Sequence, residues 1–275
     1  MLTPSAIRFP DEVRADLEAH RAGLAAETEQ AFLVHARPCV AITAVRVSDR
    51  PLQRNPVARL FGARAAGPVL AATVSKFGGI PYTQGDDSWD GRQFLGQVDL
   101  AEATSVLAPQ GPSLRGLLRL DLPAGDGLRA RWFPDPSPDR ALPAAVESVG
   151  KWETRLEFKL AWTLPEGNAL EALWPLREPN WCEYDEFFPA GYNQDGRDEF
   201  HRLLGHKSSG LDEHYGFTAP DGCGADLDGY ESLLRLTFDN TAGFAWGTNW
   251  IYLLVPREDL ARGDLSRVVV TGANS

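Results

Sequence analysis

The chain has 275 residues, with 38 carboxylates against 27 lysines and arginines and a formal net charge of −11. This charge repels phosphate backbones and anionic lipid, which argues against nucleic-acid and membrane partners; it suits a basic protein partner, although solubility alone would also explain it. The 3 cysteines are too widely spaced for a disulfide framework, and no apolar run is long enough to cross a membrane, so we expect a cytoplasmic protein.

The first expected element is an N-terminal amphipathic helix over residues 11–37, in which apolar side chains recur at helical spacing. Pro38 is expected to end it, and the apolar run CVAITAVRV is expected to form a buried strand. Residues 1–70 therefore form a helix-and-strand preamble. We expect this preamble to be continuous with a main domain over residues 71–275.

The main domain opens with a Gly-Gly turn at 78–79, an acidic loop, and the strand FLGQVDL. Two further strands, LRGLLRLDL and LRARWF, read as a meander. The strongest β pattern is KWETRLEFKLAWTL, residues 151–164, where apolar and charged side chains alternate strictly. Such alternation gives a sheet one buried and one solvated face, which is typical of antiparallel sheets and favours an α+β fold.

The last part of the chain predicts a short helix within RDEFHRLLGH, residues 197–206, which ends at Gly205. Strands are expected over 232–240, 249–256 and 265–272, with a helical turn over 257–264. Two stretches resemble each other, because KFGGIP…FLGQVDL and RLLGHK…LLRLTFD each place a glycine turn before a strand that ends in aspartate. This echo predicts a mainly antiparallel β fold with two diverged, related halves.

Several motifs together resemble a known family. KFGGIP, the loop with Trp89, FLGQVDL, HRLLGH, LLRLTFDN, FAWGTNWIYLLVPREDL and LSRVVV look like the signature of the YwqG-like family, a bacterial domain of unknown function. The resemblance spans about residues 72–273. It implies a mainly β, α+β fold with two related halves and no established activity, and an immunity-type role near bacterial toxins.

The chain departs from the family pattern at three places. Asp90 follows Trp89 where the family has proline, and His206-Lys207 replaces Tyr-Pro after the second glycine turn. Thr248 replaces the aspartate of a Trp-Gly-Asp motif, which weakens any shared chemistry assigned to that carboxylate.

The acidic loop at residues 86–90 resembles the first half of a calcium loop. Asp86, Ser88, Asp90 and Gly91 fit the pattern, but Gln97 stands where calcium requires a bidentate glutamate. A polar turn explains the loop better, and we expect no metal there.

Gln97 and Asp99 are expected to share the outward face of their strand, with Phe94, Val98 and Leu100 on the core face. The pair could hold a ligand, or it could satisfy backbone groups of the crossing second half. We favour the structural role, because buried polar groups usually find partners within the chain.

Aromatic and acidic residues gather in the stretch 181–195, where Trp181 and Tyr184 stand among carboxylates. Aromatic rings beside carboxylates can bind a sugar, a cationic group or a basic peptide, or they can simply cover a sheet. We take this stretch, the acidic loop and the exposed Trp89 as the candidate partner surface.

Metal and catalytic motifs are weak in this sequence. His201, His206 and His214 lie near Asp221 and Cys223, but the spacing of the first two does not place them on one helix face, so zinc is not expected. No nucleophile elbow, phosphate loop or complete dinucleotide fingerprint is present. A glycosidase-like carboxylate pair stays open, enzymatic activity is uncertain and leans to none, and no cofactor is expected.

Two functions remain open from the sequence. The first is a protein-binding or toxin-immunity module that acts by non-covalent contact, with a basic protein as its partner. The second is a small-ligand binder or enzyme whose site lies between the halves, where Gln97 and Asp99 would face Asp239 and Trp246. A deep pocket with a neutralised carboxylate would favour the second, and a filled junction would count against it. The sequence gives no oligomeric state.

Overall fold

The computed structural model describes residues 37–48, 52, 70–84, 89, 92–109, 111–123, 128–138, 147–163, 201–207, 229–244 and 250–273. The N-terminal helix expected before Arg37, the acidic loop other than Trp89, and the stretch 181–195 lie outside these residues.

The described elements follow one another along the chain in an order dominated by strands. They are β1 (Arg37–Arg46), β2 (Lys76–Phe77), β3 (Arg92–Asp99), α4 (Leu100–Ser105), β4 (Leu117–Pro123), β5 (Arg129–Phe133), β6 (Glu147–Ser148), β7 (Thr154–Thr163), β8 (His201–Leu203), β9 (Tyr230–Thr237), β10 (Trp250–Pro256), α9 (Arg257–Arg262) and β11 (Val269–Ala273).

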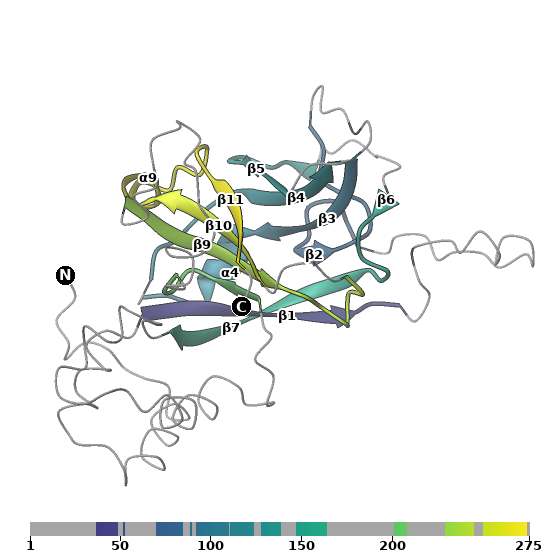
Figure 1. The fold of residues 1–275 in the computed structure, drawn as a ribbon, viewed down its shortest axis with the longest axis horizontal. Coiled ribbons are helices and arrows are strands. Elements are labelled where there is room, and N and C mark those ends of the chain that lie inside the picture. The colour runs from purple at the N-terminus through teal and green to yellow at the C-terminus, as the bar shows by residue number, and fades with distance from the viewer. Residues whose placement is uncertain are drawn as a thin grey trace, which may run out of the picture.

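The strands form a single sheet in the described part of the chain, in the order β11-β10-β9-β8-β1-β7-β2-β3-β4-β5. All pairs along this path are antiparallel, and β6 adds a short parallel pairing to β3. The sheet curls so that its two end strands, β5 and β11, approach each other, which makes it a nearly closed barrel (Figure 1). The expected mainly antiparallel β architecture is confirmed.

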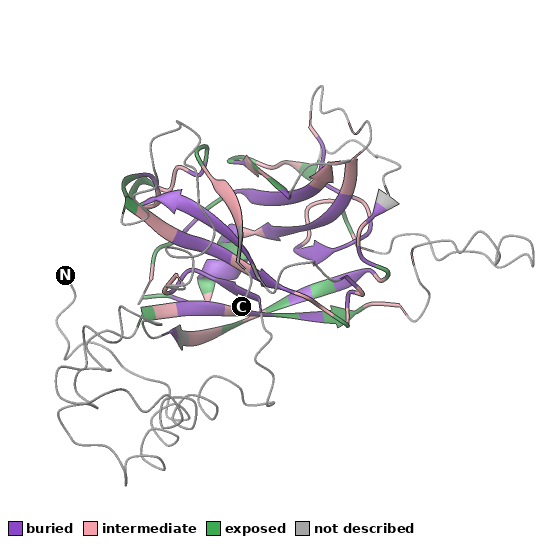
Figure 2. Cartoon of the chain, viewed as in Figure 1, coloured by how far each residue is buried: buried purple, intermediate pink, exposed green. Residues whose placement is uncertain are grey.

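β1 and β7 form the ladder at the centre of the strand order, with the register running from Arg37↔Thr163 to Arg46↔Thr154. The alternation predicted for β7 is confirmed from Thr154 onward, since buried and exposed side chains alternate along it (Figure 2). Glu153 is the exception, because it was expected in solvent and is only 2% exposed. β7 begins at Thr154, the residue after Glu153, so the strand's alternation does not set the direction of the Glu153 side chain. Its Oε1 accepts the Leu70 N–H.

Two local predictions around β1 and β8 are wrong. Residues 201–203 are a strand and not the end of a helix, because β8 is paired on both sides, with β1 and with β9. Tertiary pairing overrides the local helical pattern here. Pro38 lies inside β1, where it pairs opposite Trp162, and it does not end a helix at residue 37.

The glycine turn after β2 has the predicted conformational cause. Gly78 and Gly79 adopt φ values of 68° and 82°, in the left-handed region. A Cβ on Gly78 would lie 2.8 Å from the Trp152 carbonyl oxygen, and one on Gly79 would overlap the Glu153 carboxylate. The turn therefore needs glycine both for its backbone angles and for its close contact with residues 152–153.

β3 carries a bulge that changes which side chains face the core. The pairing with β4 shifts between Phe94 and Gly96, so Leu95 is an extra residue. Leu95 and Val98 both join the central hydrophobic cluster, whereas Phe94 is buried outside it, opposite Asp121. The prediction that Phe94 shares the core face with Val98 is therefore wrong.

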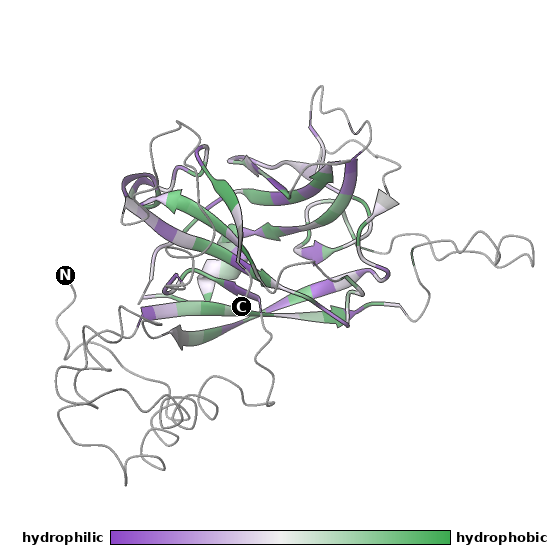
Figure 3. Cartoon of the chain, viewed as in Figure 1, coloured by the Kyte–Doolittle hydropathy of each residue, from purple (hydrophilic) through white to green (hydrophobic). Residues whose placement is uncertain are grey.

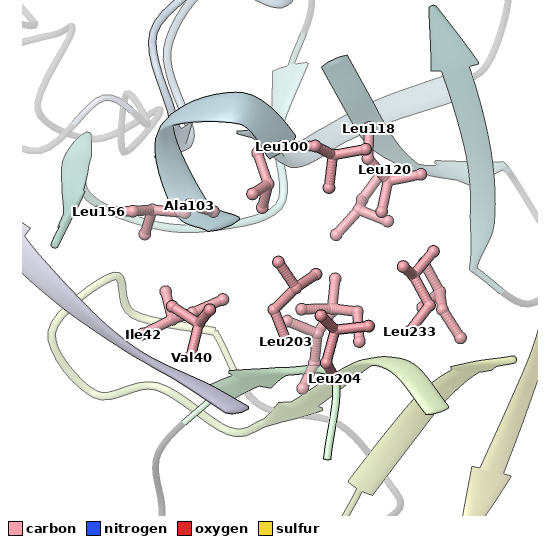
Figure 4. Packing of buried hydrophobic residues seen from close by; sticks show 14 of the residues in the cluster. Val40, Ile42, Leu100, Ala103, Leu118, Leu120, Leu156, Leu203, Leu204 and Leu233 are labelled. Carbon is pink, nitrogen blue, oxygen red and sulfur yellow. The ribbon is translucent and has the colours of Figure 1, made fainter. Parts of the chain in front are cut away.

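The interior of the barrel is filled by apolar side chains from most of the strands (Figure 4). Figure 3 shows that hydrophobic residues recur along these strands. Figure 4 shows two groups of side chains facing each other across the interior. One group comes from β4 and α4 and includes Leu118, Leu120, Leu100 and Ala103; the other comes from β1, β8, the residue that follows β8, and β9. This second group includes Val40, Ile42, Leu203, Leu204 and Leu233. This packing leaves the outer surface of the sheet as the place where polar side chains gather.

Candidate functional site

Gln97 lies on the outer face of the barrel, but it is completely buried and does not point into solvent. Its Nε2 donates to the carbonyl oxygens of Ala72 and Val74, and its Oε1 accepts the Tyr82 N–H at 2.9 Å. The amide therefore fastens the segment 70–84 over β3. The predicted position of Gln97 on the outer face of its strand is correct, but the side chain is not exposed, and its contacts are those of the structural role.

Asp99 ends β3 and begins α4. Its Oδ1 accepts the N–H groups of Ala101 and Glu102 at 3.0 and 3.1 Å, which caps the first turn of the helix. Its own N–H donates to Ser75 Oγ. The Asp99 carboxylate therefore binds the backbone of α4, as a helix cap does.

Trp89 was expected to be exposed, and it is partly buried against Arg119. The guanidinium carbon of Arg119 lies 4.3 Å from the centre of the Trp89 ring and 5.2 Å from that of Phe133. Arg119 is fully buried and binds both carboxylate oxygens of Asp121, and its Nη1 donates to the Tyr82 carbonyl at 2.7 Å. Trp89 thus covers a buried ion pair.

Asp239 pairs with His201, which is buried at the start of β8. The distance from His201 Nε2 to Asp239 Oδ2 is 3.0 Å, and Asp239 Oδ1 accepts the N–H groups of Thr241 and Ala242. Burial alone would raise the pKa of Asp239, but the hydrogen bond from His201 and those from these backbone N–H groups outweigh it and hold the pKa below its ordinary value. This carboxylate is ionised, which is the opposite of a general acid held near neutral.

The His201–Asp239 pair resembles part of a catalytic relay, but its surroundings do not suit one. His201 Nδ1 accepts the Thr237 N–H at 3.1 Å, and the ring packs against Phe77 and Phe244 with centroid distances of 4.9 and 5.9 Å. Both imidazole nitrogens are therefore used within the fold, and the ring is 2% exposed. Among the described residues it has no open side from which to act on a substrate.

The predicted site residues do not converge. Gln97 and Asp99 bind residues of the 70–84 segment and of α4, whereas Asp239 binds β8 and its own turn, and among the described residues the two sets have no hydrogen-bond partner in common. Trp181, Tyr184 and Trp246 lie outside the described residues.

Sequence reasoning missed a row of polar residues that crosses five strands on the outer face. Register places Arg131, Arg119, Gln97, Lys76 and Arg155 side by side, from β5 through β4, β3 and β2 to β7. Lys76 is fully buried, and its Nζ donates to the carbonyl oxygens of Leu70 and Ala71. Burial lowers the pKa of Lys76 to about 8, against the opposing attraction of Glu153. The sequence did contain a signal for this row: charged residues stand among apolar ones in LLRLDL, and a lysine stands next to Phe77.

One part of this outer face is uncovered. Five residues are exposed there, and we call them the ribbon face: Thr43 and Val45 of β1, and Arg155, Glu157 and Lys159 of β7. Val45 is 40% exposed and is the one large hydrophobic side chain exposed in the described part of the chain. Within that same part, no hydrogen bond or ion pair engages the three charged groups. The charges of these three residues alternate in sign along β7. In the β1–β7 register, Val45 lies beside Arg155 and Thr43 lies beside Glu157.

Other chemistry finds no support in the described part of the chain. Burial raises the pKa of the Cys39 thiol to about 12, despite the opposing charges of Arg202 and Arg235, so this thiol is not a reactive nucleophile. No group of three or more histidine, cysteine, aspartate or glutamate side chains is placed there to hold a metal ion. Of the helices described, none has the length and apolar character that spanning a membrane requires.

No family model matches the chain, and no curated protein matches it either. The resemblance to the YwqG-like family stays a prediction.

Proposed function

We propose that this chain is a protein-binding module, of the toxin-immunity type suggested by its resemblance to the YwqG-like family, that acts in the cytoplasm by non-covalent contact. The observation that carries the proposal is the filled barrel: apolar side chains occupy its interior, and the described polar candidates are bound to the chain's own backbone. Function is then left to the outer surface. The net charge of −11 favours a basic protein as the partner.

Two related halves are part of the same proposal, and several features support them. The strand order is symmetric about the β1–β7 ladder, with β2-β3-β4-β5 on one side and β8-β9-β10-β11 on the other. Asp99 and Asp239 both accept N–H groups two and three residues ahead. Gly79 and Gly205, each just after a short inner strand, both have positive φ. Such a duplication presents two similar outer surfaces.

The alternative, a small-ligand binder or enzyme with its site between the halves, has less support. It needs Gln97 and Asp99 to face Asp239 across a pocket, and these side chains serve separate turns. The space between the sheet walls holds the hydrophobic cluster of Figure 4.

The test is affinity capture from the source cells at low salt, followed by reconstitution with the purified partner. A basic protein that binds with a defined stoichiometry, and loses affinity as salt is raised, supports the proposal. An unrelated protein of equal net charge serves as the control bait. Capture of nothing beyond what the control captures would contradict the proposal.

A further inference from the structure

We infer that the ribbon face binds a second copy of this chain, with the two barrels packed face to face and their β7 strands antiparallel. This goes beyond the proposed function, because it names a partner that the chain itself supplies.

The inference starts from the charge order along β7. Arg155, Glu157 and Lys159 are two residues apart, so their side chains project from the same side of the strand at a spacing of about 6.6 Å. Within the described part of the chain none of them has an ion-pair partner. A face that alternates positive, negative and positive is complementary to a copy of itself shifted by one such step.

Two-fold symmetry fixes how the copies would meet. The two-fold axis would lie midway between the two sheets, perpendicular to β7, and would pass over the point halfway between Arg155 and Glu157. Rotation about this axis places Arg155 of each copy opposite Glu157 of the other. An isologous interface therefore gains two identical ion pairs from one pair of residues. Because facing sheets stack about 10 Å apart, long arginine and glutamate side chains from both copies can meet between them.

The neighbouring strand fits the same axis. Val45 pairs opposite Arg155 and Thr43 opposite Glu157 in the β1–β7 register. The axis thus sets Val45 against Thr43 of the second copy, and the exposed valine becomes covered. Lys159 falls outside the reciprocal pairs.

Other macromolecules suit this face less well. A polyphosphate chain would meet Glu157 between the two cations and would be repelled by the overall charge of −11. That charge also opposes two copies at long range, but at 0.15 M salt charges more than about 8 Å apart are largely screened.

The experiment is sedimentation velocity of the full chain over a concentration series at 0.15 M salt. The variants are Arg155→Glu, Glu157→Arg, their combination, and Lys159→Glu as the matched control; all three positions are exposed, and circular dichroism checks their folding. Wild type and K159E are expected to dimerise alike. Each of R155E and E157R is expected to weaken dimerisation by about tenfold or more, because both reciprocal pairs become like-charged.

The decisive measurement is restoration. The double variant R155E/E157R is expected to dimerise within about threefold of wild type, because reversing both charges keeps the pairs. An equimolar mixture of the two single variants is expected to form a heterodimer more tightly than either associates alone. A monomeric wild type at all concentrations, a double variant no better than the singles, or loss of dimer only in K159E would overturn the inference. None of these outcomes bears on capture of a basic partner.

Discussion

His201 Nε2 lies 3.0 Å from Asp239 Oδ2, and the opposite ring nitrogen accepts the Thr237 N–H. Because Nδ1 accepts, the neutral ring carries its proton on Nε2 and donates it to the carboxylate. The pair ties the start of β8 to the turn after β9. It is a structural clamp whose strength depends on the ionised state of Asp239.

Acid is expected to release this clamp. The pKa of Asp239 is lower in the folded chain than in the unfolded one, so its stabilisation is complete above about pH 4 and is lost as the pH falls through the folded-state value. Replacing Asp239 by asparagine should cost about 1–3 kcal/mol of unfolding free energy at pH 7 and almost nothing at the lowest pH. Urea unfolding of both proteins from pH 7 downward measures this, and a pH-independent difference would contradict it.

Alkali is expected to act in the opposite sense at Lys76. Its folded-state pKa of about 8 lies below the ordinary value, so the folded chain releases this proton before the unfolded chain does. Stability contributed by this group therefore rises between about pH 8 and pH 10.4, by at most about 3 kcal/mol. The unfolding free energy of wild type minus that of Lys76→Met should increase over this range. Lys159→Met, at an exposed position, is the control and should run parallel to wild type.

The buried ion pair between Arg119 and Asp121 gives a prediction about paired removal. Arg119→Met leaves the Asp121 carboxylate buried without its guanidinium, which should cost about 3–5 kcal/mol. Arg119→Met combined with Asp121→Leu should recover part of that loss, because the carboxylate is removed together with the guanidinium that it binds. A double-mutant cycle by denaturant unfolding gives the coupling, and a double variant less stable than R119M would refute this account.

Replacing Gly79 and Gly263 by alanine distinguishes two costs: the backbone strain of a positive φ and the steric overlap of an added Cβ. Both have positive φ, 82° and 71°, but a Cβ at Gly79 would overlap Glu153, whereas one at Gly263 would meet nothing within 4 Å. Gly263→Ala should therefore lose about 1 kcal/mol from backbone strain alone. Gly79→Ala should lose clearly more, and Gly229→Ala, where φ is not positive, serves as the neutral control. Equal losses at 79 and 263 would mean that the overlap relaxes freely.

Much of the β architecture could be predicted, because period-two alternation reports directly on which face of a strand is buried. β7 follows from such alternation, whereas β10 follows from a continuous apolar run whose residues 251–256 are all buried. β8 could not be predicted, since a three-residue strand owes its conformation to pairing on both sides. The bulge at Leu95 was equally hidden, and it moved Phe94 to the other face.

The candidate site was harder still. The outward position of Gln97 on its strand was correct, but its burial depends on the segment 70–84 lying over it, which no local pattern reveals. Asp99 and Asp239 were both noticed as strand-ending residues, and their roles, a helix cap at Asp99 and a turn at Asp239, follow from ordinary aspartate chemistry. The ribbon face was visible as a solvated pattern, but the lack of ion pairs on it required the three-dimensional contacts.

The position of the β1–β7 ladder has a consequence for how the chain reaches its fold. Arg37 and Thr163 are paired although 126 residues separate them in the sequence. The hairpin of β4 and β5 can form from neighbouring residues, but the ladder must close a long loop first, which slows folding. During synthesis β1 emerges well before β7 has been made. Val40 and Ile42 therefore lack their pairing partners Leu160 and Phe158 until then. The strand at the centre of the barrel's order is thus its most aggregation-exposed strand until the second half is made.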